Sequence, residues 1–133
     1  MLHSDYQWPI TFPENVPDDS AIPACGEAYR LVSAIPPTSD DFKIYKEDNP
    51  SFKPSKDDKK YSFGVSFWST LDMAREIKRR YPKPNQFGNK KIALVSFKKE
   101  IGMIAIDKPT DFHVSLWKQS GYCPSSCFVK EEL

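Results

Sequence analysis

The chain has 133 residues, of which 28% are charged and 14% aromatic, and its formal net charge is +1. This length fits one domain that needs no metal or disulfide staples, and the composition excludes a disordered chain. The near balance of charge makes nucleic acid a less expected partner, because proteins that grip duplexes carry a strongly basic face. No apolar run approaches the roughly 18 residues of a membrane-spanning helix, and the first residues lack an export signal. We therefore expect a cytoplasmic protein with no membrane partner.

Residues 1–24 are rich in proline, aspartate and serine and show neither helical nor alternating periodicity. Large apolar residues are scattered among them, namely Trp8, Ile10, Phe12, Val16 and Ile22. Because such residues argue against complete disorder, we predict an extended, proline-rich arm that packs on the rest of the chain. Residues 25–133 then form the single domain.

The first predicted strand covers residues 28–32, in which Arg30 and Val32 share one face. Two prolines end this strand. Thr38, followed by an aspartate three residues later, resembles a helix N-cap. The pattern therefore predicts a short helix over residues 39–47.

Residues 49–60 are polar and predict a solvated loop. Residues 61–68 alternate most clearly between apolar and polar side chains, which predicts a strand. Ser69, with an aspartate three residues later, is expected to cap a helix over residues 70–81, and two prolines follow that helix.

Three further strands are predicted at residues 91–98, 102–107 and 112–117. Their close spacing favours antiparallel hairpins. The predicted class is α+β, with a small mixed or antiparallel sheet, two main helices and the N-terminal arm.

The segment from Ser66 to Thr70 ends a predicted strand in hydroxyl residues and turns directly into a helix. Such a turn places the N–H groups of a helix N-terminus beside the hydroxyls of Ser66 and Ser69, which suits a phosphate or a sugar. The alternative interpretation is an ordinary helix cap.

Arg30 lies inside a predicted strand among apolar residues, and an unpaired buried charge is costly. Two interpretations remain open: a clamp for an anion such as a phosphate, or an arginine that faces solvent at a sheet edge. His113 shares a strand face with Ser115 and Trp117, a row that suits the lining of a pocket. A lone histidine on a strand is more often a surface or core residue.

Glu100 precedes a glycine in a turn between strands, where a carboxylate can bond a ribose or stabilise a cationic intermediate. Exposed turn glutamates are the common alternative. Cys25, Cys123 and Cys127 form a four-ligand zinc set only together with His113, and just one close pair of thiols is present. We therefore expect no metal and interpret the thiols as packing or surface groups.

The order of these elements resembles the ADP-ribosyltransferase-like superfamily, by layout. Its members place an arginine or histidine in an early strand, then a strand that ends in hydroxyl or aromatic residues and runs into a helix, and later a glutamate or another polar residue. Here Tyr29-Arg30-Leu31 matches the first element, and Val65 to Thr70 with Ala74 matches the second. Glu100 and His113 are the candidates for the third, and neither lies in a Glu-x-Glu or Gln-x-Glu pattern.

The resemblance spans roughly residues 27–117 and implies NAD as the substrate. It implies that Arg30 holds the pyrophosphate or the nicotinamide ribose and that Trp68 stacks on a flat ring. The ribose would be supported by Ser66 and Ser69. Either Glu100 or His113 would polarise that ribose as nicotinamide leaves. The small size implies a toxin, an effector or a phage-conflict protein.

The alternative function is a non-enzymatic interaction module that binds a protein partner. The proline-rich arm, three tryptophans expected to be exposed and the lack of a clear catalytic carboxylate favour it. If the enzyme interpretation holds, Arg30, Ser66, Ser69 and His113 meet in one cleft. An Arg30→Ala substitution is then expected to abolish nucleotide binding and to change the thermal midpoint by only a few degrees.

Overall fold

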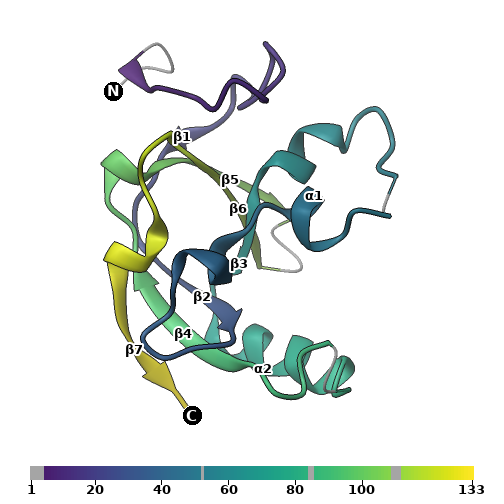
Figure 1. Cartoon of the computed structure of the whole chain (residues 1–133), viewed down its shortest axis with the longest axis vertical. Coiled ribbons are helices and arrows are strands. Elements are labelled where there is room, and N and C mark those ends of the chain that lie inside the picture. Colours follow the sequence, from purple (N-terminus) through teal and green to yellow (C-terminus); the bar gives the residue numbers. More distant parts are fainter. Residues whose placement is uncertain (1–4, 52, 84–85, 109–111) are drawn as a thin grey trace.

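An antiparallel sheet of seven strands runs through the described part of the chain (Figure 1). The computed structural model describes residues 5–51, 53–83, 86–108 and 112–133. Across the sheet the strands are ordered β1-β5-β6-β3-β2-β4-β7, and neighbouring strands run antiparallel. Their bounds are β1 Ile22–Pro23, β2 Glu27–Val32, β3 Val65–Trp68, β4 Lys91–Ser96, β5 Gly102–Lys108, β6 His113–Lys118 and β7 Phe128–Glu132.

Two α-helices and several short 3-10 turns connect the strands. The helices are α1 Tyr45–Asp48 and α2 Leu71–Arg80; the 3-10 turns include η2 Ser39–Phe42, η3 Lys59–Phe63, η4 Lys99–Ile101 and η5 Pro124–Cys127. Figure 1 shows α2 at the bottom of the view, and the helix contacts β2 and β3. Its Ala74 forms a buried apolar cluster with Leu31 of β2 and Ile92 of β4. In the described ranges, neither helix has the length or hydrophobicity required to cross a lipid bilayer.

The α+β class is confirmed, and the sheet is antiparallel throughout its described pairs. The three strands predicted at residues 91–98, 102–107 and 112–117 correspond to β4, β5 and β6. The face of β2 that holds Arg30 and Val32 also forms part of the largest core cluster, in which Val32, Phe67 and Leu116 are fully buried. Leu31 on the opposite face of β2 is buried as well, in the cluster with Ala74 and Ile92, so both faces of this strand are covered.

The predicted helix over residues 39–47 is wrong, because the chain forms η2 and α1 with an extended break at Lys43 and Ile44. A continuous helix would direct the carbonyl groups of Asp41 and Phe42 to backbone N–H groups one turn later. Both carbonyls instead accept bonds from cationic side chains that the sheet contributes. The helix breaks where these tertiary bonds replace its own.

The predicted strand over residues 61–68 is half right, because its first part belongs to η3 and only Val65–Trp68 pairs in the sheet. The indole of Trp117 donates to the carbonyl oxygen of Lys60 at 2.9 Å, and Ser62 donates to Lys59 at 2.6 Å. These bonds stabilise the turn η3. Phe63 is buried there even though it lies outside the strand. The cap of α2 is also displaced by one residue from Ser69, because the Thr70 hydroxyl accepts the N–H of Met73.

The described N-terminal residues cover a second apolar cluster on the β5–β6 side of the sheet. Tyr6 and Val16 are buried against Met103 and Trp117. The rings of Tyr6 and Trp8 stack with centroids 5.1 Å apart. The segment also supplies the edge strand β1, which pairs with β5, so residues of the predicted arm form part of the sheet itself.

A steric constraint at Gly102 predicts a large loss of stability for Gly102→Ala. Its φ of 154° lies in the region that favours glycine, and an added Cβ would overlap the carbonyl oxygen of Trp117. We expect the free energy of unfolding, measured by urea denaturation, to fall by about 3 kcal/mol. Gly121→Ala is the matched control: its φ is also positive, at 84°, but its Cβ would meet no atom within 4 Å. The control should lose about 1 kcal/mol, and equal losses would contradict the steric argument.

Candidate functional site

The sheet opens between β2 and β3. These strands share one residue pair, Tyr29 with Trp68, whereas β2 pairs with β4 along its whole length. Continuing the same register would place Leu31 opposite Ser66, but the two strands do not pair there. The backbone groups that would have joined the ladder must therefore find other partners.

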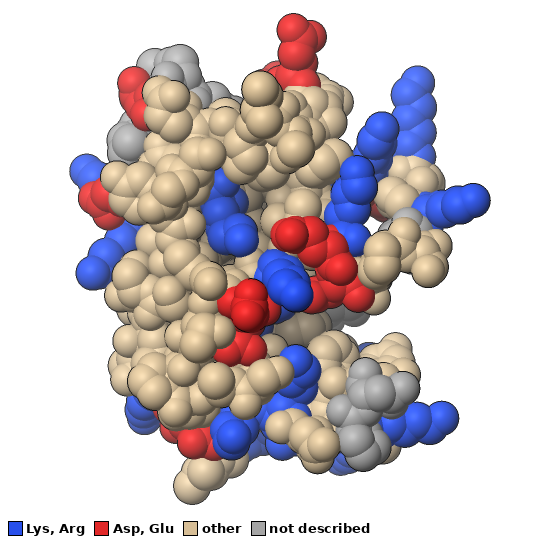
Figure 2. Space-filling view, in the orientation of Figure 1, with Lys and Arg blue, Asp and Glu red and all other residues tan. Residues whose placement is uncertain are grey.

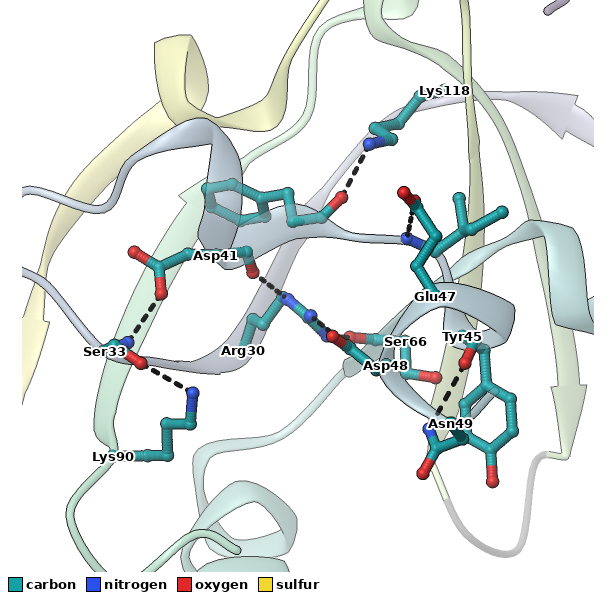
Figure 3. Close-up of polar contacts among 12 residues, drawn as sticks. Arg30, Ser33, Asp41, Tyr45, Glu47, Asp48, Asn49, Ser66, Lys90 and Lys118 are labelled. Atoms are coloured by element: carbon teal, nitrogen blue, oxygen red, sulfur yellow. Dashed lines mark hydrogen bonds and ion pairs between the residues drawn. The ribbon is translucent and has the colours of Figure 1, made fainter. Parts of the chain in front are cut away.

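Arg30 lies at this opening and bonds to three different elements (Figure 3). Its Nε donates to the carbonyl oxygen of Asp41 in η2 at 2.6 Å, and Nη1 donates to that of Ser66 in β3 at 2.9 Å. Its Nη2 forms an ion pair with the Asp48 carboxylate of α1 at 3.2 Å. The arginine is buried, and its guanidinium lies 6.0 Å from the centroid of the Phe42 ring. Burial lowers the pKa of Arg30, Asp48 acts in the opposite direction, and the group stays charged.

Further polar bonds hold the segment from η2 to α1 against the sheet. The Asp41 carboxylate accepts the N–H groups of Ser33 at 2.7 Å and Thr38 at 3.0 Å. Lys118 of β6 donates from Nζ to the carbonyl oxygen of Phe42 at 2.6 Å, and burial lowers the pKa of this lysine. Two cations of the sheet thus fix consecutive carbonyl groups of η2.

A cleft of about 780 Å³ begins at the opening, which is within the usual size of small-molecule sites. Its floor is formed by Arg30, Leu31, Ser66, Trp68 and His113. One side, which we name the α1 wall, consists of Asp40, Asp41, Lys43, Tyr45, Asp48 and Asn49. The opposite side, the α2 wall, consists of Met73, Ile77, Arg80, Tyr81, Gln86, Phe87 and Lys90. Figure 2 shows acidic and basic side chains together around this hollowed face.

An aromatic pair crosses the floor of the cleft. Trp68 of β3 lies opposite His113 of β6 in the sheet register, and their rings meet edge-to-face with centroids 5.9 Å apart. Both side chains are half-buried, and so is Ser66. The floor therefore offers a flat ring, an imidazole and a hydroxyl group within one cavity.

Four of the six residues singled out from the sequence line this cleft: Arg30, Ser66, Trp68 and His113. Ser69 is exposed outside the lining, and its N–H donates to the carbonyl oxygen of Phe112 at 2.8 Å. Glu100 is exposed in η4, also outside the lining, and its carbonyl oxygen accepts a bond from Gln119 at 2.8 Å. Arg30 fits neither of the two interpretations drawn from the sequence. It is buried, and its nitrogens bond to protein groups, so it links β2 to η2, β3 and α1.

Most residues of both walls are not among the candidates predicted from the sequence. Tyr45, Asp48 and Asn49 follow directly on η2, where the pattern predicted the end of a helix and a solvated loop. Lys90 lies just before β4, in a stretch that had no assigned role. A signal was present in the tyrosine, acidic and amide residues of the segment 45–49, but such polar runs are common on solvated surfaces.

The cysteines make no disulfide: Cys25 is exposed, Cys123 half-buried and Cys127 buried. Within the described ranges, no group of three or more histidine, cysteine, aspartate or glutamate residues is arranged to hold a metal ion. No protein-family model, curated protein sequence or solved structure shows significant similarity to the chain.

Replacing Arg30 is expected to destabilise the fold, contrary to the small thermal effect predicted from the sequence. Arg30→Met leaves the carbonyl oxygens of Asp41 and Ser66 without their donors, and each unsatisfied buried acceptor costs about 1–3 kcal/mol. We expect the free energy of unfolding, from urea denaturation, to fall by about 3 kcal/mol. Arg79→Met, at a side chain 77% exposed, should change it by less than about 0.5 kcal/mol. Equal stability of the two variants would contradict the assigned role.

Proposed function

We propose that the cleft binds NAD or a related nucleotide and that the domain acts as an ADP-ribosyltransferase-like enzyme. The observation that carries this proposal is the convergence of Arg30, Ser66, Trp68 and His113, from three separate strands, on one cavity of about 780 Å³. The hydroxyl of Ser66, the ring of Trp68 and the imidazole of His113 are groups that suit contacts with a nucleotide. Their meeting in a single cleft supports the proposal.

The chemistry of the cleft suits the parts of a nucleotide. Lys90 and Arg80 supply positive charge for phosphates. Lys90 donates to the neutral hydroxyl of Ser33 at 2.6 Å, so no carboxylate neutralises it in that contact. Trp68 offers a flat surface for a ring, and the carboxylate of Asp48 offers an acceptor for ribose hydroxyl groups.

Arg30 takes a different part from the one implied by the resemblance. Its bonds to Asp41, Ser66 and Asp48 position the floor and the α1 wall. We assign the phosphates to the α2 wall instead, because the described partners of Lys90 leave its charge available. Arg30 is thus a positioning residue in this proposal.

In the proposed reaction the glycosidic bond between nicotinamide and ribose breaks, and nicotinamide leaves with the electron pair. A nucleophilic atom of an acceptor forms the new bond at the same ribose carbon and releases its proton. His113, on the floor beside Trp68, is proposed to polarise the ribose as charge develops there. Glu100, the other candidate, takes no part because it lies outside the cleft lining. A cytoplasmic toxin, effector or phage-conflict protein remains the proposed context.

Binding is tested by isothermal titration of the chain with NAD, ADP-ribose and a panel of oligonucleotides. We expect saturable binding of NAD and ADP-ribose at one site and no comparable binding of the oligonucleotides. Trp68→Ala removes the flat surface of the floor and should weaken nucleotide binding by about tenfold. A chain that binds neither nucleotide would overturn the proposal and leave the interaction module as the surviving alternative.

Turnover is tested by measuring nicotinamide release from NAD by chromatography. His113→Ala should lower the rate by about 100-fold, the lower range for loss of a group that assists proton or charge transfer. Glu100→Gln is the control, since this side chain lies outside the cleft lining, and it should leave the rate unchanged. A rate lost in Glu100→Gln and retained in His113→Ala would reverse the assignment.

A further inference from the structure

The two walls of the cleft differ in charge. The α1 wall carries three carboxylates, Asp40, Asp41 and Asp48, and one lysine, Lys43. The α2 wall carries two cations, Arg80 and Lys90, and no carboxylate lies among its lining residues. Arg30 of the floor offsets the charge of Asp48, and a ligand that spans the cleft therefore meets a more negative surface on the α1 side than on the α2 side.

The three carboxylates of the α1 wall are not equivalent. Asp41 is buried, and its oxygens accept the N–H groups of Ser33 and Thr38. Asp48 pairs with Arg30, but its side chain is 42% exposed and keeps acceptor capacity toward the cleft. Asp40 is exposed, and the structure gives it no ion pair within the described ranges. Asp40 and Asp48 are thus the two carboxylates that a ligand can reach.

The α2 wall combines its positive charge with apolar and aromatic surface. Tyr81 and Phe87 meet edge-to-face with centroids 6.0 Å apart, and Met73 and Ile77 lie on the same wall. Flat apolar surface beside cations fits a purine base with its phosphates attached. Arg80 is also bonded to Glu76 at 3.1 Å, so Lys90 is the stronger candidate for the phosphates.

We propose that the cleft takes a dinucleotide in one orientation, with its adenine and phosphates on the α2 wall and its nicotinamide on the α1 wall, where Asp40 and Asp48 select the positively charged, oxidised ring. This inference rests on the proposed function and adds a redox preference to it. The oxidised nicotinamide ring carries a positive charge and the reduced ring is neutral, while their shapes are nearly the same. Discrimination between them must therefore come from charge, and within a partly enclosed cleft a carboxylate acts on a cation more strongly than in bulk water.

The test is isothermal titration of the full chain with NAD, NADH and ADP-ribose at low salt. For two partly exposed carboxylates we expect NAD to bind about tenfold more tightly than NADH. Asp40→Asn keeps the shape of the side chain and should reduce this ratio to about threefold, mainly by weakening NAD. Asp72→Asn is the matched control, because it removes the same charge from a side chain of α2 that is 98% exposed and outside the cleft lining. It should leave the ratio unchanged.

A second variant tests the orientation. Lys90→Met should weaken NAD, NADH and ADP-ribose by a similar factor of about tenfold, because all three carry the same phosphates. Equal affinity of the wild-type chain for NAD and NADH, or an Asp40→Asn variant that weakens both equally, would overturn the redox preference while the proposed function stands. Loss confined to NAD in Lys90→Met would overturn the orientation. If neither NAD nor ADP-ribose binds the wild-type chain, the proposed function fails and this inference fails with it.

Discussion

The bonds of one buried arginine connect the parts of this structure that matter most for its cleft. Where β2 and β3 separate, the guanidinium of Arg30 supplies donors to a carbonyl of β3, a carbonyl of η2 and a carboxylate of α1. A buried charge is tolerated only when such partners satisfy it. The same bonds therefore satisfy a buried cation and also supply a partner where the β2–β3 ladder is incomplete.

The opening in the sheet gives the molecule its cleft, and the two walls are attached to the sheet by different combinations of forces. The η2–α1 segment is held by burial of Phe42 in the core and also by polar bonds from Arg30 and Lys118. Helix α2 is held mainly by apolar packing of Ala74 against Leu31 and Ile92. Apolar burial is non-directional, whereas hydrogen bonds fix position, so the α1 wall is the more narrowly defined of the two.

The sequence predicts the positions of most strands because short runs rich in apolar and β-branched residues, bounded by prolines or polar turns, are typical of strands. It predicts Arg30, Ser66, Trp68 and His113 as candidates because each has a residue type that is costly or unusual at its position. It fails over residues 39–47, where the break depends on cations that come from strands distant in the chain. Local sequence patterns carry no information about such partners. For the same reason, the sequence does not predict that Asp48 and Lys90 line the cleft.

Glu100 and Ser69 lie outside the cleft lining, for a related reason. A turn glutamate and a helix-capping hydroxyl look the same in sequence whether the turn faces a cleft or solvent. The arrangement of the strands decides which way a turn faces. Here η4 lies beside Gln119, away from the opening between β2 and β3. The candidates on strands line the cleft and the candidates in turns do not, because the register of a strand constrains where its side chains lie.

The attachment of the α1 wall also affects how this protein can change over evolutionary time. Arg30 and Lys118 bind the backbone carbonyls of Asp41 and Phe42, and a carbonyl is present whichever side chain a residue carries. Exchanges at Asp40, Lys43 or Tyr45 therefore leave these two attachments in place while they alter the surface that faces a ligand. The fold thus separates the groups that hold the wall from those that a ligand would meet, so descendants could acquire new ligands without rebuilding the sheet.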